Sequence, residues 1–195
     1  LVIRLTASQP GTLSFTMSPT IPFLQEKKER SKRGTVRAEG DLVTMSGEME
    51  GYAVQFEGQF RVFQEGGVLE TLADAIRVRD AVSATIVAAI GTNYRMESRV
   101  FTEPDPHKKL APYPHPHEMV SEILAKASAY DYETLRARHL ADYRELFGRV
   151  SLCLGTEGAD IPTDELLERY RGGEKLPYLE ALYFQYGRYL LISSS

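Results

Sequence analysis

The alternation of hydrophobic and polar residues predicts short, closely spaced β-strands in the first half of the chain. Residues 1–18 are rich in β-branched residues and contain Pro10-Gly11, so we expect a hairpin that turns there. Residues 35–46 carry Gly40 between two further runs and predict a second hairpin. Residues 25–34, which include Lys27, Lys28, Arg30, Lys32 and Arg33, are expected to form a solvated polar loop.

The clearest strand lies in residues 52–62, where side-chain character alternates with a period of two. One face is apolar and contains Tyr52, Val54, Phe56, Phe60 and Val62, and the other contains Gln55, Glu57, Gln59 and Arg61. We therefore expect one core face and one polar face. The shared face of Tyr52, Phe56 and Phe60 favours packing in a core over a sugar-binding platform.

Two short strands near residues 68–71 and 75–79 precede a nearly continuous apolar run at residues 82–90. Such a run is typical of a buried strand, and many close strands indicate an antiparallel β-sandwich. Five prolines in residues 103–116 then predict an extended, irregular connection. We place the end of the sandwich at Asn93.

From His117 onwards the hydrophobic period becomes 3.6 residues, which predicts helices. Met119, Val120, Ile123, Leu124 and Ala127 form the stripe of a first helix. Asp131 is positioned to cap a second helix, with a helical stripe reaching Phe147, and Gly148 is expected to end it. We expect a short strand at residues 150–154 and a helix at residues 164–171.

The last segment predicts a helix that begins at Pro177 and is apolar on nearly every face. Its large residues are Tyr178, Leu179, Leu182, Tyr183, Phe184, Tyr186, Tyr189, Leu190, Leu191 and Ile192. Such a helix needs other helices around it, and the preceding sequence offers too few. We therefore expect the chain to be a piece of a larger protein, with the missing helices after Ser195.

Composition and charge narrow the function classes. The chain is 43% hydrophobic with a net charge of −4, so it is globular and lacks the basic excess that nucleic-acid binding requires. No window reaches the roughly 18 apolar residues of a membrane span, so we expect no membrane partner. The single cysteine, Cys153, cannot form an internal disulfide and is expected to be buried. Localisation and oligomeric state stay undetermined.

Candidate chemical groups are few, and each has a structural interpretation. His107, His115 and His117 lack partners with recognised metal-ligand spacing, so we expect no metal site. His139 lies beside the stripe of its helix and is expected to pack or to hydrogen-bond between helices. Ser193-Ser194-Ser195 lacks a nucleophile-elbow pattern and fits a polar helix end.

The polar residues of the last helix allow two interpretations. Gln185 and Arg188 could line a sugar-binding cavity, or they could form a buried structural network. No pair of acid–base carboxylates can be chosen by spacing, because the 27 acidic residues are scattered along the chain.

Several ordered segments resemble the glycoside hydrolases of family 95, the α-L-fucosidase family. Similarity begins at residues 1–11, continues at residues 132–152 and 162–165, and is strongest at residues 181–195. This last segment starts Ala-Leu-Tyr-Phe-Gln-Tyr-Gly-Arg-Tyr. The resemblance runs nearly the whole length of the chain.

The resemblance implies an α+β architecture in three parts. We expect the end of a β-sandwich at residues 1–93, a linker with helices and a short strand at residues 94–175, and the first helix of an (α/α)6 barrel at residues 176–195. The family's catalytic residues lie on later barrel elements, so we assign no catalytic residue to this chain and leave substrate-binding residues unknown.

The resemblance also implies a parent enzyme that hydrolyses terminal α-L-fucosides or α-L-galactosides with inversion, and needs no metal or other cofactor. A fucosylated oligosaccharide would be its partner, and we expect a bacterial source. This segment alone is expected to be inactive. A carbohydrate-binding sandwich without activity and a disaccharide phosphorylase of similar architecture are alternatives.

Overall fold

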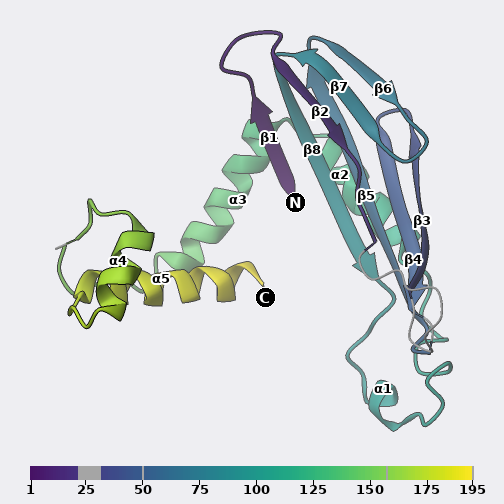
Figure 1. Ribbon diagram of the computed structural model, residues 1–195. Helices are drawn as coiled ribbons and strands as arrows, with labels where there is room; N and C mark the ends of the chain where they lie inside the picture. Colours follow the sequence, from purple (N-terminus) through teal and green to yellow (C-terminus); the bar gives the residue numbers. More distant parts are fainter. Residues whose placement is uncertain (22–31, 50, 157, 195) are drawn as a thin grey trace. The chain divides into compact units, whose positions relative to one another are not determined.

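The computed structural model describes residues 1–21, 32–49, 51–156 and 158–194 (Figure 1). By compactness the chain divides into two units, residues 1–135 and residues 136–195. The elements are β1 (Val2–Thr6), β2 (Leu13–Met17), β3 (Lys32–Glu39), β4 (Leu42–Met49), β5 (Val54–Glu65), β6 (Val68–Thr71), β7 (Ile76–Ala81), β8 (Ser83–Thr92), α1 (Ser98–Thr102), α2 (His117–Ser128), α3 (Tyr132–Phe147), α4 (Thr163–Arg171) and α5 (Pro177–Ser193).

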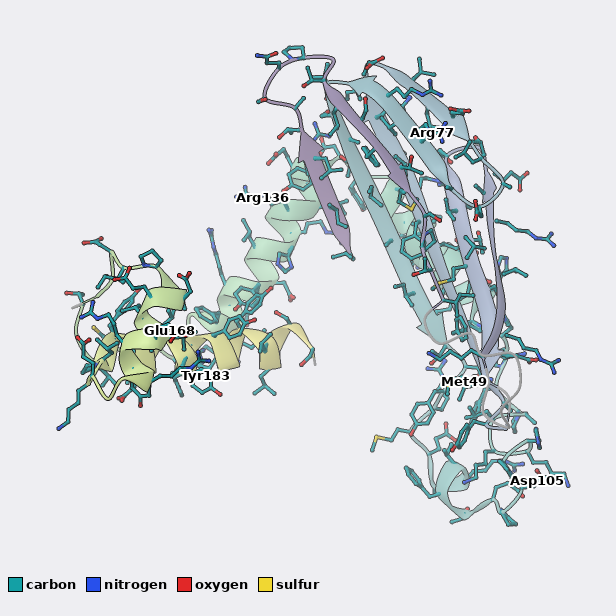
Figure 2. The ribbon with its side chains drawn as sticks, viewed as in Figure 1. Met49, Arg77, Asp105, Arg136, Glu168 and Tyr183 are labelled. Atoms are coloured by element: carbon teal, nitrogen blue, oxygen red, sulfur yellow. The ribbon has the colours of Figure 1, made fainter. Side chains whose placement is uncertain are left out.

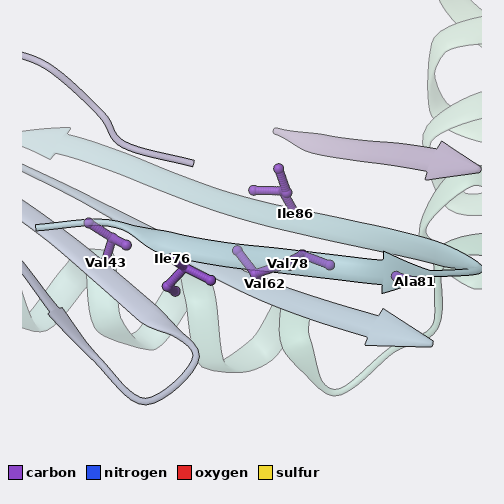
Figure 3. Close-up of a cluster of buried hydrophobic side chains, with 6 residues drawn as sticks. All are labelled: Val43, Val62, Ile76, Val78, Ala81 and Ile86. Atoms are coloured by element: carbon purple, nitrogen blue, oxygen red, sulfur yellow. The ribbon is translucent and has the colours of Figure 1, made fainter. Parts of the chain in front are cut away.

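The first unit is built on a β-sandwich, as the strand pattern predicted. One sheet has the order β1-β8-β5-β4-β3, the other has the order β2-β7-β6, and all neighbouring strands are antiparallel. Side chains from both sheets form the core between them (Figure 3), namely Val43, Val62, Ile76, Val78, Ala81 and Ile86. Burial of these side chains provides the main driving force that joins the two sheets.

The expected hairpin over residues 1–18 is wrong. β1 pairs with β8 in the larger sheet, whereas β2 pairs with β7 in the smaller one. The turn therefore carries the chain from one sheet to the other, with the Thr12 hydroxyl donating to the Gln9 carbonyl at 2.7 Å and Gly11 at a φ of +78°. The same turn residues suit a hairpin or a crossover, so local sequence does not distinguish them.

The second predicted hairpin is confirmed. Glu39 pairs with Leu42 across a two-residue turn whose first residue, Gly40, has a φ of +58°. The paired strands β3 and β4 are longer than expected, since Lys32, Arg33 and Gly34 belong to β3. The other basic residues of the expected polar loop, Lys27, Lys28 and Arg30, lie outside the described residues.

Helix α2 lies on the outer face of the larger sheet, against β8 and β5 (Figure 1). Val120 and Leu124 of α2 pack with Val87 and Ala89 of β8 in a second buried cluster. Helix α2 consequently shields part of the polar face of β5 from solvent. Glu57 and Gln59, which the strand pattern placed on that face, are buried.

The connection before α2 is mostly irregular, as its prolines predicted. Residues 103–116 form no helix or strand, although the short helix α1 precedes them unexpectedly. Leu110 is buried within this connection, and the Lys109 ammonium group donates to the Val100 carbonyl. Compactness divides the chain after Leu135, and the domain division at residues 93 and 175 stays a prediction about the parent protein.

The predicted cap of α3 is confirmed, because the Thr134 backbone N–H donates to the Asp131 carboxylate at 2.7 Å. This hydrogen bond is the largest cause of the lowered pKa of Asp131. The helix ends at Phe147, one residue before Gly148, as expected. In the second unit, α4 and α5 also form where predicted, and Leu166, Leu176 and Leu179 make a small core.

The strand expected at residues 150–154 does not form, and Cys153 is exposed rather than buried. All regular elements described in residues 136–195 are helices, so no neighbouring strand is present to pair with this segment. Its apolar residues Val150, Leu152 and Leu154 are 50%, 37% and 46% exposed.

Replacing Gly47 tests how closely β3 and β4 approach. Gly47 is paired with Gly34, and a Cβ atom at Gly47 would clash with the Arg33 carbonyl oxygen. We expect Gly47→Ala to lower the free energy of unfolding of the chain by about 1–3 kcal/mol, measured by urea unfolding. The exposed neighbour Glu48 supplies a control, since Glu48→Ala should change stability by only about 0.5 kcal/mol. Equal effects of the two substitutions would contradict this account.

Two adjacent residues of α2 test its docking on the sheet. Leu124 is 2% exposed and Ile123 is 49% exposed. Leu124→Ala should reduce the free energy of unfolding by about 2–5 kcal/mol because it leaves a cavity against β8. Ile123→Ala should cost clearly less in the same chemical unfolding experiment. The docking of α2 would be refuted by two substitutions of equal cost.

Candidate functional site

The most prominent surface of the second unit is the aromatic side of α5. Only Leu179 and Ala181 of this helix are buried. Six large side chains are well exposed, and Tyr183, labelled in Figure 2, is 79% exposed. They are Tyr183, Phe184, Tyr186, Tyr189, Leu190 and Leu191. The described helices of this unit therefore leave much of α5 uncovered, which is the situation predicted from its sequence.

Gln185 and Arg188 of α5 form a structural network. The Arg188 guanidinium donates to the Phe147 carbonyl at 2.8 Å, to the Val150 carbonyl, and to the Gln185 side-chain oxygen at 2.7 Å. It also lies 4.7 Å above the Phe147 ring centroid. A cation that binds the last carbonyls of a helix is favourable because those groups lack intrahelical partners. These contacts favour the structural interpretation of Gln185 and Arg188.

Aromatic rings continue this network along α3 and α5. Tyr143 stacks with His139 and with Phe147, at centroid distances of 5.9 Å and 5.3 Å, and meets the Tyr189 ring edge-on at 5.9 Å. Burial raises the pKa of Tyr143, with a further contribution from Tyr189. His139 therefore packs, which confirms one of its two expected roles. At the end of α5, the Ser194 hydroxyl donates to the Leu191 carbonyl as a polar helix end would, and Ser195 lies outside the described residues.

The N-terminus of α2 meets a buried carboxylate of β5. Glu57 accepts hydrogen bonds from His117 Nδ1 at 2.8 Å and from the Gln59 amide at 2.7 Å. The same amide nitrogen contacts the Ser121 hydroxyl at 2.8 Å. His115 Nδ1 accepts the backbone N–H of His117 at 3.2 Å, which leaves its Nε2 to face Ser46 at 3.4 Å. Their spacing in the sequence made these histidines candidate metal ligands. In the structure they connect the N-terminus of α2 to Glu57 of β5 and Ser46 of β4.

The two histidines and the carboxylate of this cluster are engaged in hydrogen bonds with one another and with their neighbours. Within the described ranges, no group of three or more His, Cys, Asp and Glu side chains is placed to hold a metal ion. His107 instead uses its backbone N–H to contact the Asp105 carboxylate. Among the helices of the same ranges, none is long and apolar enough to cross a membrane.

The three aromatic residues expected on one face of the sandwich have different positions. Phe60 packs against the core between the sheets, as its alternation predicted. Phe56 belongs to β5 and is half-buried, whereas Tyr52 precedes the strand and is 36% exposed. They therefore do not form a flat, exposed row of rings along β5.

A pocket of about 210 Å³ opens where α2 leaves the outer face of the larger sheet. Its floor comes from three neighbouring strands, in which Arg4 pairs with Thr85 and Thr85 pairs with Phe63. The connection from α2 to α3 supplies further lining residues, among them Ser128, Tyr130 and Tyr132. This pocket is not evident from the sequence, because its residues are dispersed among four segments of the chain.

Charged and polar groups in the pocket are tightly organised. Arg4 donates to the Thr85 hydroxyl at 2.8 Å and to both oxygens of Glu65, and it lies 5.9 Å from the Tyr132 ring centroid. The hydrogen bond from Ser83, followed by the contacts with Arg4, lowers the pKa of Glu65. A basic side chain, two acidic groups and aromatic rings thus face one small space. Such a mixture suits recognition of a small polar ligand.

Comparison with protein families agrees with this arrangement of parts. Residues 1–97 match the model described as glycosyl hydrolase family 65, N-terminal domain. Residues 131–195 match the model described as glycosyl hydrolase family 95 catalytic domain. The first match covers the sandwich strands, and the second covers α3, α4 and α5 up to Ser195.

Curated relatives include one plant and two fungal proteins. The chain is 30% identical over 221 aligned positions to Alpha-L-fucosidase 2 of Arabidopsis thaliana, an alignment that covers all of this chain and 25% of the plant protein. It is 40% identical over 84 residues to Probable alpha-fucosidase A of Aspergillus niger, covering 42% of this chain and 10% of the relative. Against Probable alpha-fucosidase A of Aspergillus oryzae the identity is 33%, covering 62% and 17% respectively.

The chain thus spans about a quarter of the plant relative's length. The plant and fungal sources give no support to the bacterial source that we expected. The family matches follow the order of the sandwich and the helical unit, and the relatives carry fucosidase names. Together these findings identify the chain as a segment of the glycoside hydrolase family 95 type, in which the sandwich matches an N-terminal-domain model and residues 131–195 match the family 95 catalytic-domain model.

Proposed function

We propose that this chain is the non-catalytic front part of an inverting α-L-fucosidase-type hydrolase. Its parent would cleave terminal α-L-fucosyl or α-L-galactosyl linkages of an oligosaccharide. The main support is the exposed aromatic surface of α5, which falls within the match to the family 95 catalytic domain. The names of the plant and fungal relatives support the choice of substrate.

The role that we assign to the chain is to dock, orient and stabilise the rest of the catalytic domain. An exposed surface with several tyrosines and leucines would be costly to leave in water and gains free energy when other helices cover it. Arg188 links α5 to the end of α3 through main-chain carbonyls. In this proposal, α5 is the first helix of the barrel and α3 holds it in position.

The proposed reaction uses two chemical groups that lie on other parts of the parent. An inverting glycosidase needs a carboxylic acid that protonates the leaving oxygen and a base-activated water on the opposite face of the sugar. These groups stand about 6.5–9.5 Å apart in inverting enzymes, which leaves space for the water. We assign neither role to a residue of this chain, and we propose that the chain alone is inactive.

Activity measurements test this assignment. We expect residues 1–195 alone to release no fucose from aryl α-L-fucosides or fucosylated oligosaccharides, and the full-length parent to release it. Adding the separately produced remainder of the parent to this chain should restore turnover. NMR of the initial product should show the β-anomer, because inversion converts the α-linkage. A folded parent that is inert on every α-L-fucoside and α-L-galactoside would refute the proposal.

Two other functions remain as alternatives with their own outcomes. A phosphorylase of similar architecture would require inorganic phosphate for turnover and would release a sugar phosphate, whereas the proposed hydrolase turns over without phosphate. A sandwich that acts only by binding carbohydrate would leave the full-length parent without any bond cleavage. Turnover measured with and without phosphate therefore separates the three functions.

A substitution in α5 tests the docking role separately from catalysis. Tyr183 is exposed in this chain, so Tyr183→Ala should change the stability of residues 1–195 by only about 0.5 kcal/mol. In the full-length parent the same substitution should cost about 3–5 kcal/mol, because the ring would be buried against other helices. Urea unfolding of both proteins measures the difference. A cost that is equally small in both would contradict docking through this surface.

A further inference from the structure

The pocket at the end of α2 lies wholly within the first unit and has no place in the proposed hydrolysis. Strands β1, β5 and β8 form its floor, and residues 128–132 close one side. Helix α2 covers Val87 and Ala89 of the same sheet face but ends at Ser128, beyond which Thr85 and Phe63 line the open space. The pocket is therefore the continuation of the helix-covered face past the last turn of α2.

One polar atom in the pocket lacks a partner. The Ser128 hydroxyl oxygen is buried, and no hydrogen-bond partner for it occurs in the described part of the chain. A buried hydroxyl without a partner costs about 1–3 kcal/mol, so such groups usually meet a water or a ligand. Ser128 lines the pocket, which places this unsatisfied group beside a space that a ligand can enter.

The charged groups that line the pocket already have partners within the protein, namely Arg4 and Ser83 for Glu65 and the Thr134 backbone for Asp131, which favours a neutral ligand over an ion. Glu65 and Asp131 both have a lowered pKa, through hydrogen bonds from Ser83 and from Thr134 respectively, so both are ionised at neutral pH and disfavour an anion. The Arg4 guanidinium already lies over the Tyr132 ring and disfavours an organic cation at that aromatic face. The remaining ligand class is neutral and polar.

The side chains around the pocket match such a ligand in both its polar and its apolar parts. Carboxylates accept hydrogen bonds, a guanidinium donates them, and a hydroxyl does both, so a compound with several hydroxyl groups satisfies all three types. Phe63, Tyr130 and Tyr132 offer apolar area with a polar edge. The volume of about 210 Å³ is below the range of about 300–1,000 Å³ for sites of drug-sized ligands, which favours one small unit.

We propose that this pocket binds a single neutral sugar unit, with hydroxyl groups meeting Arg4, Asp131 and Ser128 and the carbon skeleton packing on the tyrosines. This inference goes beyond the proposed function, because the site is formed by the sandwich and the turn after α2. It does not require that the parent be a fucosidase. The ligand could be a free monosaccharide or one residue of a longer glycan, and these share the same chemistry.

Photoaffinity labelling locates the binding without depending on turnover. The full-length protein would be treated with an α-L-fucoside that carries a diazirine, and the labelled peptides would be mapped by mass spectrometry. We expect saturable labelling within residues 63–65 or 128–132, with at least a fivefold decrease on adding excess free L-fucose, D-galactose or D-glucose. A fucosylated oligosaccharide as competitor distinguishes a glycan residue from a free monosaccharide.

Two substitutions in the pocket and one control outside it complete the test. Tyr130→Ala should reduce labelling of these segments at least fivefold, whereas Tyr94→Ala removes an exposed tyrosine outside the pocket and should leave labelling unchanged. Ser128→Ala should reduce labelling at least threefold without lowering the unfolding temperature, because it removes a polar atom that is unsatisfied in the free protein. Ser128→Ala keeps the test valid if Tyr130→Ala fails to fold.

The proposal is overturned by any of three results. The first is that no competed label maps to residues 63–65 or 128–132. The second is that Ser128→Ala, and Tyr130→Ala where it folds, label as the unchanged protein does. The third is that choline or acetate competes more strongly than every neutral sugar, which would assign the pocket to a charged ligand. Since position of labelling is measured and not cleavage, loss of the proposed hydrolase activity would leave the result intact.

Discussion

The fold of the first unit depends on the need to bury both faces of β8. Ile86 points into the core between the sheets, while Val87 and Ala89 pack beneath α2. A strand with apolar residues on both faces is stable only when a layer covers each side. The smaller sheet and α2 are these two layers, so the apolar run of residues 82–90 determines a three-layer arrangement of sheet, sheet and helix.

Strands and helices with strong periodicity were predicted from the sequence, whereas the pairing of the first strand was not. The alternation in β5, the Asp131 cap and the start of α5 at Pro177 are local signals, and each is found in the structure. The residues that pair with β1 lie 77 to 85 positions further along the chain, from Thr6 with Ser83 to Val2 with Val87. Hydrophobic pattern also misled at Val150, since an apolar run becomes a strand only beside another strand.

The candidate sites also divide into those that a local sequence signal predicts and those that depend on contacts between distant segments. The exposed aromatic surface of α5 was predicted from the sequence, because all the residues that form it lie on one helix. Glu57 gave no such signal, since its burial results from the arrival of α2 sixty residues later. The pocket joins Arg4, Thr85 and Tyr130 from distant segments: strand pairing brings Arg4 to Thr85, and the packing of α2 on β8 brings Tyr130. The one signal in the sequence was Arg4, a basic residue between the apolar residues Ile3 and Leu5 of the first strand.

The contacts of Arg188 have a consequence for how this segment can vary between relatives. Two of its acceptors, at Phe147 and Val150, are main-chain carbonyls, which every amino acid provides. Substitution at Val150 would therefore preserve that acceptor, while loss of Arg188 would remove the donor and with it the hydrogen bond. For these two hydrogen bonds the sequence requirement therefore lies on α5, whereas the contact of Arg188 with the Phe147 ring also depends on a side chain of α3. Divergent sequences after α3 can share the same helix junction as long as the arginine on α5 is retained.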